Sequence, residues 1–188
     1  MSLLMEKKKF TYADFLDWDE GTRIEIIDGD SFVLDTPPTI HQLVSGPLGA
    51  QLYSYLKGKT GEVFWGPLAV RLFEKEGDRP EDVRTVVLPD IIVICDPAKL
   101  DEHGCKGAPD LIIEILSPST SRRDRLVKYD LYQRAGVREY WIVDPDTRTV
   151  QVYTLEEGRY HAAQLFNDTV PVGVLEGCAI GLKDVFPA

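Results

Sequence analysis

Asp110-Leu111-Ile112-Ile113-Glu114-Ile115-Leu116 is the stretch that decides the fold, because it is an almost continuous apolar run with a carboxylate in its interior. Dense apolar runs that are enriched in β-branched residues are typical of strands covered on both faces. Val86–Cys95 has the same character and contains Asp90. We therefore expect two buried strands here, joined by a polar loop over Asp96–Ala108.

Helical and strand patterns alternate around this pair of strands. Apolar residues at three- and four-residue steps predict a helix over Thr39–Lys57 that Gly58 ends, and Val63–Phe73 follows as a strand candidate. Downstream, Ser121 begins a helix that Gly136 ends, and Glu139–Asp144 is a further strand. The middle of the chain thus reads helix, strand, strand, strand, helix, strand.

The two ends of the chain are expected to be short and mostly antiparallel. Their predicted elements are a helix over Tyr12–Trp18, a hairpin of Arg23–Ile27 and Phe32–Leu34 around Asp28-Gly29-Asp30, and strands over Thr149–Leu155, Tyr160–Phe166 and Gly173–Leu182. The predicted fold class is α+β, with an N-terminal β-hairpin, one mixed sheet and a C-terminal antiparallel meander. We expect residues 1–188 to form a single domain, with Met1–Leu3 interpreted as vector-derived.

Composition places the chain among ordinary folded proteins. Of its 188 residues, 44% are hydrophobic and 28% are charged. The longest apolar runs, Ile91–Cys95 and Tyr140–Val143, are far shorter than the roughly 20 residues that a membrane-spanning helix needs. Three cysteines without a C-x-x-C pair argue against a disulfide framework, so a reducing, cytoplasmic location is expected.

The charge balance limits the partners. The 21 basic and 31 acidic residues give a formal net charge of −10. An acidic protein lacks the global attraction to nucleic acid that a basic one has, which counts against a sequence-independent DNA coat protein. A locally basic site, or an acidic site that first recruits a metal cation, remains compatible with this charge.

Charged residues inside segments that should be buried give the strongest functional signal. Asp90 and Glu114 each interrupt an apolar run, and an ionised carboxylate in an apolar interior costs several kcal/mol at least unless it is paired or bound to a cation. Period-two geometry places Asp110, Ile112 and Glu114 on one face of their strand. If the two strands are neighbours, Asp90 and Glu114 converge.

The following helix repeats this pattern. At about 100° per residue, Asp124 and Lys128 fall on the stripe that should face the core. The apolar members of that stripe are Val127, Leu131, Tyr132 and Ala135. Glu25, between Ile24 and Ile26 of the hairpin, is a further candidate.

Carboxylates beside an ammonium group suit phosphodiester hydrolysis. Carboxylate oxygens are ligands that Mg²⁺ or Mn²⁺ prefers, and a bound cation activates water and neutralises charge on a phosphate. A nearby ammonium group can orient the attacking water and stabilise the transition state. The candidates are Asp90 and Glu114 as metal ligands and catalytic groups, Lys128 as a catalytic group, and Glu25, Asp110, Asp124 and His41 in support.

Structural interpretations remain open for several of these residues. Glu114 and Asp90 could each pair with a buried Arg23 or Arg71, or with Lys128. Asp124 and Lys128 also have the spacing of an i,i+4 ion pair, and Asp124 could complete a capping box with Ser121. His41 either reaches the cleft or has a surface or capping role. Arg122, Arg123 and Arg125 either contact a nucleic-acid phosphate or form a solvated face.

The chain resembles the Uma-two family of restriction-endonuclease-like proteins in the PD-(D/E)XK superfamily, over about residues 12 to 186. The residues that carry the resemblance are Glu25–Gly29, Pro38–His41, Leu88–Asp90, Gly107–Thr120, Asp124, Lys128 and Gly136–Trp141. The resemblance implies a core of helix, three antiparallel strands, helix and strand, with a divalent-metal nuclease site. Asp90 would be its first aspartate and Glu114 its second acid. Leu116 stands where that superfamily has lysine, and Lys128 looks like the substitute.

The leading hypothesis is a DNA endonuclease that depends on Mg²⁺ or Mn²⁺. Net charge and Leu116 favour an alternative, a catalytically inactive nuclease-like fold that serves as a binding or assembly module. A third hypothesis is a metal-dependent hydrolase whose substrate is RNA or a small phosphodiester instead of DNA. We expect no membrane association, and a homodimer is compatible with the edge that the terminal meander would offer.

Overall fold

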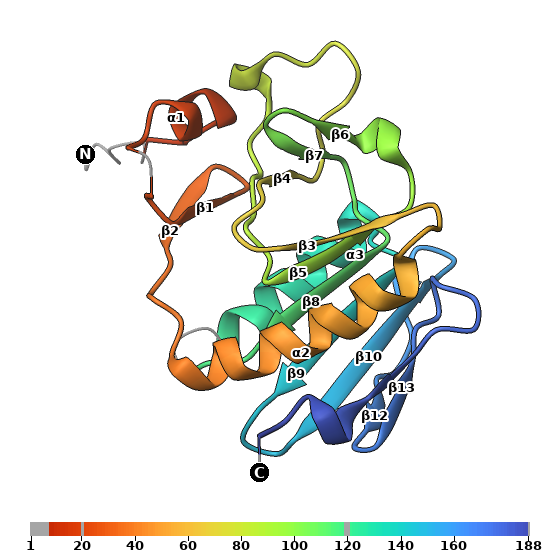
Figure 1. Ribbon diagram of the computed structural model, residues 1–188. Helices are drawn as coiled ribbons and strands as arrows, with labels where there is room; N and C mark the ends of the chain where they lie inside the picture. The colour runs from red at the N-terminus through yellow and green to blue at the C-terminus, as the bar shows by residue number, and fades with distance from the viewer. Residues whose placement is uncertain (1–7, 20, 119–120, 188) are drawn as a thin grey trace.

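The computed structural model describes residues 8–19, 21–118 and 121–187, and Figure 1 shows the arrangement of its helices and strands. Met1–Leu3 and Ser119-Thr120 of the family-like stretch lie outside the described residues. Within the described ranges, none of the helices is both long enough and apolar enough to cross a membrane.

A mixed central sheet forms the body of the fold. Its strands run in the order β11-β10-β9-β8-β5-β3, and β12 also pairs with β10. The strands are β3 (Glu62–Trp65), β5 (Ile91–Ile94), β8 (Leu111–Ile115), β9 (Glu139–Asp144), β10 (Thr149–Glu156), β11 (Arg159–Tyr160) and β12 (Gln164–Phe166). β8 and β9 are parallel, whereas β5 is antiparallel to both β3 and β8. The α+β class is confirmed.

Helices cover both faces of this sheet (Figure 1). α2 (Thr39–Leu56) packs through Val44, Leu48 and Leu52 into a core shared with one face of the strands. On the other face, a π-helical segment (Arg123–Lys128) continues into α3 (Tyr129–Ala135), and Gly136 ends this helix with a φ of 86°. The burial of both strand faces explains why their sequences are almost entirely apolar.

The N-terminal hairpin sits beside the sheet rather than in it. β1 (Ile24–Ile27) and β2 (Asp30–Val33) pair antiparallel across Asp28 and Gly29, whose φ angles are both positive. Such angles are those of a tight hairpin turn that matches the strand twist. Backbone hydrogen bonds between Ile26 and Val86 attach the hairpin to the segment before β5. α1 (Tyr12–Leu16) packs against this junction.

Short elements complete the chain. They are β4 (Val70–Arg71), β6 (Leu100–Asp101), β7 (Gly104–Lys106), β13 (Thr169–Pro171), β14 (Ala179–Gly181) and the 3₁₀ turns Pro80–Asp82, Pro97–Lys99 and Leu182–Asp184. β4, β7 and β6 form a small sheet, and β13 pairs with β14. The meander therefore ends at β12, and the last strands form a separate sheet instead of extending one mixed sheet.

Several predicted boundaries are wrong for identifiable reasons. The strand expected over Val63–Phe73 is divided into β3 and β4, because it is interrupted at Gly66-Pro67 and proline has no N–H to donate. Val86–Cys95 is a strand only over β5, while Val86 and Val87 make isolated bridges. The loop expected over Asp96–Ala108 contains the β6–β7 hairpin.

Candidate active site

Glu114 and Lys128 form the centre of a buried polar cluster between β8 and the π-helical segment. Lys128 Nζ lies 2.9 Å from Glu114 Oε1, and Tyr132 donates its hydroxyl to the same oxygen at 2.6 Å. All three side chains are buried. β8 alternation directs Glu114 and Ile112 toward this helix, which confirms the face predicted for Glu114.

The hairpin adds Glu25 to the cluster. Its Oε1 atom lies 2.8 Å from Lys128 Nζ and accepts a hydrogen bond from the Leu88 N–H at 3.0 Å. The other oxygen, Oε2, is buried and has no hydrogen-bond partner among the described residues, and Arg123 Nη1 approaches it at 3.8 Å. A buried carboxylate oxygen in this state can accept a water molecule or a cation.

Asp90 enters from the end of β5 that faces Glu114. Ile91 pairs with Ile113, so continuing the antiparallel register by one residue places Asp90 opposite Glu114. Asp90 Oδ2 accepts the Ile115 N–H at 2.8 Å and lies 2.9 Å from Nε2 of His41, which is in the first turn of α2. His41 is buried, and its Nδ1 atom has no hydrogen-bond partner in the described part of the chain.

Several of these side chains line a small cavity of about 40 Å³. Its walls include His41, Asp90, Glu114, Asp124 and Lys128. A polar cavity of this size is large enough for at least one water molecule. The hairpin, β5, β8, α2 and the helix after β8 therefore meet at one accessible acidic point.

Electrostatics in the cluster are dominated by burial. Desolvation raises the pKa of Glu114 well above its ordinary value, and the Lys128 ammonium opposes this shift. The carboxylates of Asp124 and Asp90 raise the pKa of Glu114 further. Although burial alone would lower it, the pKa of Lys128 is raised by the surrounding carboxylates, so its ammonium stays charged.

The cavity walls carry more acid than base. The acidic residues that line the cavity are Asp35, Asp90, Glu114 and Asp124, and the basic ones are Arg23 and Lys128. This excess of negative charge in a confined space fits a divalent cation. Within the described residues, however, no set of three His, Cys, Asp or Glu side chains is arranged as a metal site. A cation held by Asp90 and Glu114 would keep water among its ligands, as Mg²⁺ usually does.

Most of the predicted site residues converge, but Asp110 does not. Its carboxylate accepts the Cys95 N–H at 2.8 Å and pairs with Arg138 at 3.0 Å, outside the cavity. The structure therefore corrects the supporting role expected for Asp110. His41, for which a surface role was the alternative, is buried against Asp90.

The arginines expected to contact nucleic acid have different surroundings. Arg122 is exposed. Arg125 hydrogen-bonds Gln151 at 2.7 Å and lies 3.3 Å from Asp144. Arg123 reaches inward toward Glu25, with its guanidinium 5.0 Å from the centre of the Phe32 ring.

Sequence reasoning did not identify Tyr132 as a partner of Glu114, and it considered Arg23 only as a structural ion-pair partner rather than as a wall of the cavity. Tyr132 was assigned only to the apolar stripe, yet it lies four residues after Lys128 and thus one helical turn further on the same side. That spacing was a usable signal. Nothing in the local sequence around Arg23 could have indicated that it lines the cavity.

Three comparisons bear on this arrangement. A family model described as Uma2, "Putative restriction endonuclease", matches residues 12–183. The uncharacterized protein slr1290 of Synechocystis sp. is 25% identical over 148 residues, which cover 77% of this chain and 74% of that protein. A crystal structure from Anabaena variabilis, described as a putative nuclease belonging to DUF820, superposes with a TM-score of 0.73 at 24% identity. The match covers 94% of this chain and 97% of that one, and it shows a shared fold.

Proposed function

Because the chain belongs to the Uma2 family, described as "Putative restriction endonuclease", we propose that it is an endonuclease that hydrolyses DNA phosphodiester bonds with Mg²⁺ or Mn²⁺. The family supports a nuclease-like function, and the fold is that of its structural neighbour. The observation that carries the proposal is the convergence of Asp90, Glu114 and Lys128 on a cavity with excess negative charge, with Glu25 paired to Lys128 behind it. A restriction-endonuclease-like core is part of the same proposal.

Asp90 and Glu114 would hold the cation. Both carboxylates line the cavity from neighbouring antiparallel strands. When bound, such a cation lowers the pKa of a water molecule and offsets negative charge on the phosphate. His41 and the Ile115 N–H fix Asp90 Oδ2, and Tyr132 fixes Glu114 Oε1, so the remaining carboxylate oxygens are oriented in advance.

Lys128 would act as the charged donor of the site. Two of its protons are directed by Glu25 at 2.8 Å and Glu114 at 2.9 Å, while Asp124 Oδ1 is 3.8 Å away, beyond hydrogen-bonding distance. A third N–H is thereby left for a water molecule or a phosphate oxygen in the cavity. Glu25 then positions Lys128, and the ammonium stabilises the negative charge that develops during hydrolysis.

Plasmid cleavage in MgCl₂ or MnCl₂ tests this function. Glu114→Gln and Asp90→Asn keep the side-chain size and one acceptor oxygen but remove the charge, so each should reduce the cleavage rate by about 100-fold or more. Glu139→Gln is the matched control, because Glu139 is also buried but bonds Trp141 and Val174 outside the cavity. Unchanged cleavage in both site variants would refute the assignment.

A non-catalytic binding or assembly module is the second candidate. It is favoured by Leu116 in the position of the expected strand lysine and by the net charge of −10. Titration calorimetry separates the two functions, because the nuclease requires Mg²⁺ or Mn²⁺ binding that Asp90→Asn weakens. If neither Mg²⁺ nor Mn²⁺ binds at millimolar concentration, the binding or assembly module is favoured. Cleavage of RNA but not of DNA would instead identify RNA as the substrate of the nuclease.

A further inference from the structure

A second and larger cavity lies directly beside the acidic one. Arg23 and Leu88 are walls of both. The second cavity has a volume of about 470 Å³, which is within the range of small-molecule sites. We call it the aromatic pocket, and its defining residues are Phe15, Trp18, Thr22, Leu68, Leu88 and His103.

The lining of the aromatic pocket suits a flat ring with polar edges. Phe15 and Trp18 provide aromatic surface, Leu68 and Leu88 provide apolar surface, and polar groups such as Thr22 are also present. The rings are held in place by one another, since the Phe15 and Trp18 centroids are 5.7 Å apart and Phe10 lies 5.9 Å from Trp18. Aromatic side chains of this kind stack on unpaired nucleobases, while polar groups bond the base edges.

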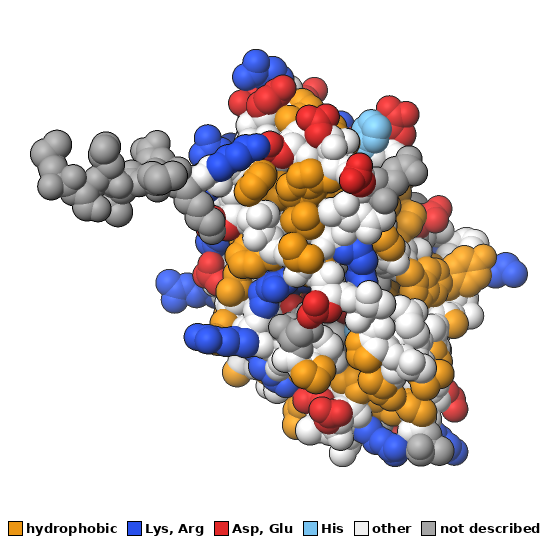
Figure 2. Space-filling model, turned by 90° about the vertical axis from the view of Figure 1, so that its left-hand side faces the viewer, with side chains coloured by type: hydrophobic (Ala, Val, Ile, Leu, Met, Phe, Trp, Pro, Cys, Tyr) orange, Lys and Arg blue, Asp and Glu red, His pale blue; other side chains and the backbone are white. Residues whose placement is uncertain are grey.

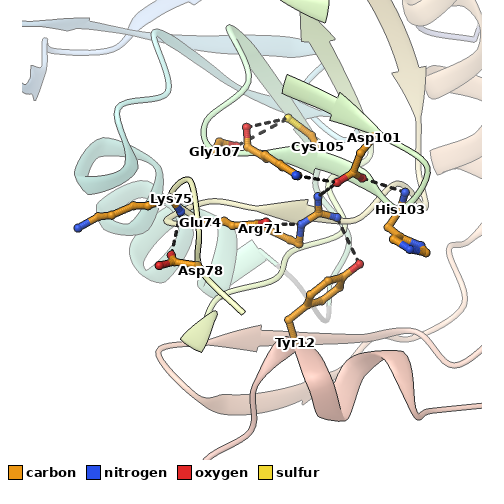
Figure 3. A network of polar contacts seen from close by, with 10 residues as sticks. Tyr12, Arg71, Glu74, Lys75, Asp78, Asp101, His103, Cys105 and Gly107 are labelled. Carbon is orange, nitrogen blue, oxygen red and sulfur yellow. Dashed lines mark hydrogen bonds and ion pairs between the residues drawn. The ribbon is translucent and has the colours of Figure 1, made fainter. Parts of the chain in front are cut away.

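A buried arginine fixes the walls of the pocket (Figure 3). Arg71 is 1% exposed and donates to the Tyr12 hydroxyl at 3.3 Å and to Asp101 Oδ2 at 2.6 Å. Tyr12 belongs to the helix that carries Phe15, and Asp101 also accepts the His103 N–H at 2.9 Å. The guanidinium therefore joins α1 to the β6–β7 hairpin, so the pocket is formed before a ligand arrives.

Arg23 stands between the pocket and the acidic cavity. Its Nη1 atom donates to the Asp35 carbonyl at 3.3 Å, and its buried Nε atom has no hydrogen-bond partner among the described residues. A guanidinium with an unused donor is well suited to a phosphate oxygen. On the face that carries α1 and the β1–β2 hairpin, hydrophobic side chains lie among Lys and Arg side chains, with Asp and Glu side chains also present (Figure 2).

We propose that the aromatic pocket binds one nucleobase of the substrate, next to the scissile phosphate. The inference rests on the proposed function for the role of the adjoining acidic cavity. A base reaches such a pocket only after it leaves the helical stack, which costs least in single-stranded or mismatched DNA. The preferred substrate is therefore a strand with an unpaired base at the cleavage position, with Arg23 on the intervening phosphate.

Calorimetric titration of the full chain, without metal, tests this pocket. The probes are dAMP, dCMP, dGMP and TMP, with 2-deoxyribose 5-phosphate as the base-free control. At least one nucleotide should bind about tenfold or more tightly than the control, as expected for one stacked base. Trp18→Ala should remove this advantage, and Trp18→Phe should keep most of it.

A pocket-filling variant avoids altering the aromatic wall. Thr22 is exposed, and its backbone N–H donates to the Asp19 carbonyl at 3.0 Å, a contact that a side-chain change leaves in place. Thr22→Phe should therefore fold normally and abolish the preference for nucleotides. Thr60→Phe, the same change beside a different hollow, should have no effect. Equal affinity for nucleotides and the base-free control, or undiminished preference in Thr22→Phe, would overturn the inference.

The two proposals fail separately. Selective nucleotide binding without cleavage of either plasmid or single-stranded DNA would support the pocket and refute the nuclease. DNA cleavage that requires Asp90 and Glu114, without selective nucleotide binding, would support the nuclease and refute the pocket.

Discussion

Lys128→Met is the substitution with the largest expected effect on stability. It removes an ammonium group that lies 2.8 Å from Glu25 and 2.9 Å from Glu114 while both carboxylates stay buried. Removing one partner of a buried ion pair costs about 3–5 kcal/mol, because the remaining charge is uncompensated. With a urea m-value of about 2 kcal/mol/M, the unfolding midpoint should fall by about 1.5–2.5 M at pH 7.

The loss should depend on pH and on divalent cations. Without the ammonium, the pKa of Glu114, already raised by burial, rises further in the folded state. A carboxyl whose folded pKa is raised contributes stability that is present below its unfolded pKa of 4.5 and lost as pH rises through the folded value. The deficit of Lys128→Met should therefore be smallest near pH 4.5 and grow toward neutral pH. Millimolar Mg²⁺ should reduce it.

Urea unfolding with matched variants checks this reasoning. Lys106→Met removes a half-exposed lysine that lies 3.4 Å from Asp101, and it should change stability by no more than about 0.5 kcal/mol. Adding Glu25→Gln to Lys128→Met should recover part of the loss, because one uncompensated carboxylate is removed. A midpoint for Lys128→Met within 0.3 M of the parent, or a deficit independent of pH, would refute the charge argument.

Two further changes test the fold around the site by urea unfolding. Asp110→Asn should lower the free energy of unfolding by about 1–3 kcal/mol at pH 7. Burial raises the pKa of Asp110, but the Cys95 N–H and Arg138 outweigh burial and hold this pKa below 3.8, so the folded state favours the ionised carboxylate. This stability is lost as pH falls through the folded pKa, so an undiminished deficit there would contradict it. Gly49→Ala should lower the free energy of unfolding by about 1–2 kcal/mol, although alanine has the better helix propensity, because the new Cβ would lie 2.3 Å from the Trp65 indole. A variant more stable than the parent would show that the indole moves freely.

Local rules were sufficient for the side chains at the centre of the site. Glu114 and Lys128 interrupt apolar patterns, and strand and helix periodicity then place them on facing surfaces. The same rule misplaced Asp110, because alternation fixes the face of a strand but not the position along it. Two strand repeats separate Asp110 from Glu114 by about 13 Å, which is too far for a shared cavity.

Other positions depend on tertiary structure that no local pattern contains. His41 reaches Asp90 only because α2 crosses the sheet, and a single histidine early in a helix does not reveal this. Val127 was expected to face the core but is 42% exposed. The π-helical hydrogen bonding of Arg123–Lys128 has more residues per turn than an α-helix, so the predicted stripe shifts while Lys128 stays inside.

Glu139 shows what separates a structural buried acid from a functional candidate. Burial raises its pKa, but its oxygens accept hydrogen bonds from Trp141 at 2.6 Å and Val174 at 2.9 Å, so its polar atoms are satisfied within the fold. In the cluster, Glu25 keeps an unsatisfied buried oxygen and Glu114 borders a cavity. Apolar residues often replace a complete buried ion pair without loss of stability, so stability alone is a weak explanation for a buried cluster of charges. Charged groups that border a cavity are what the proposed cation site requires.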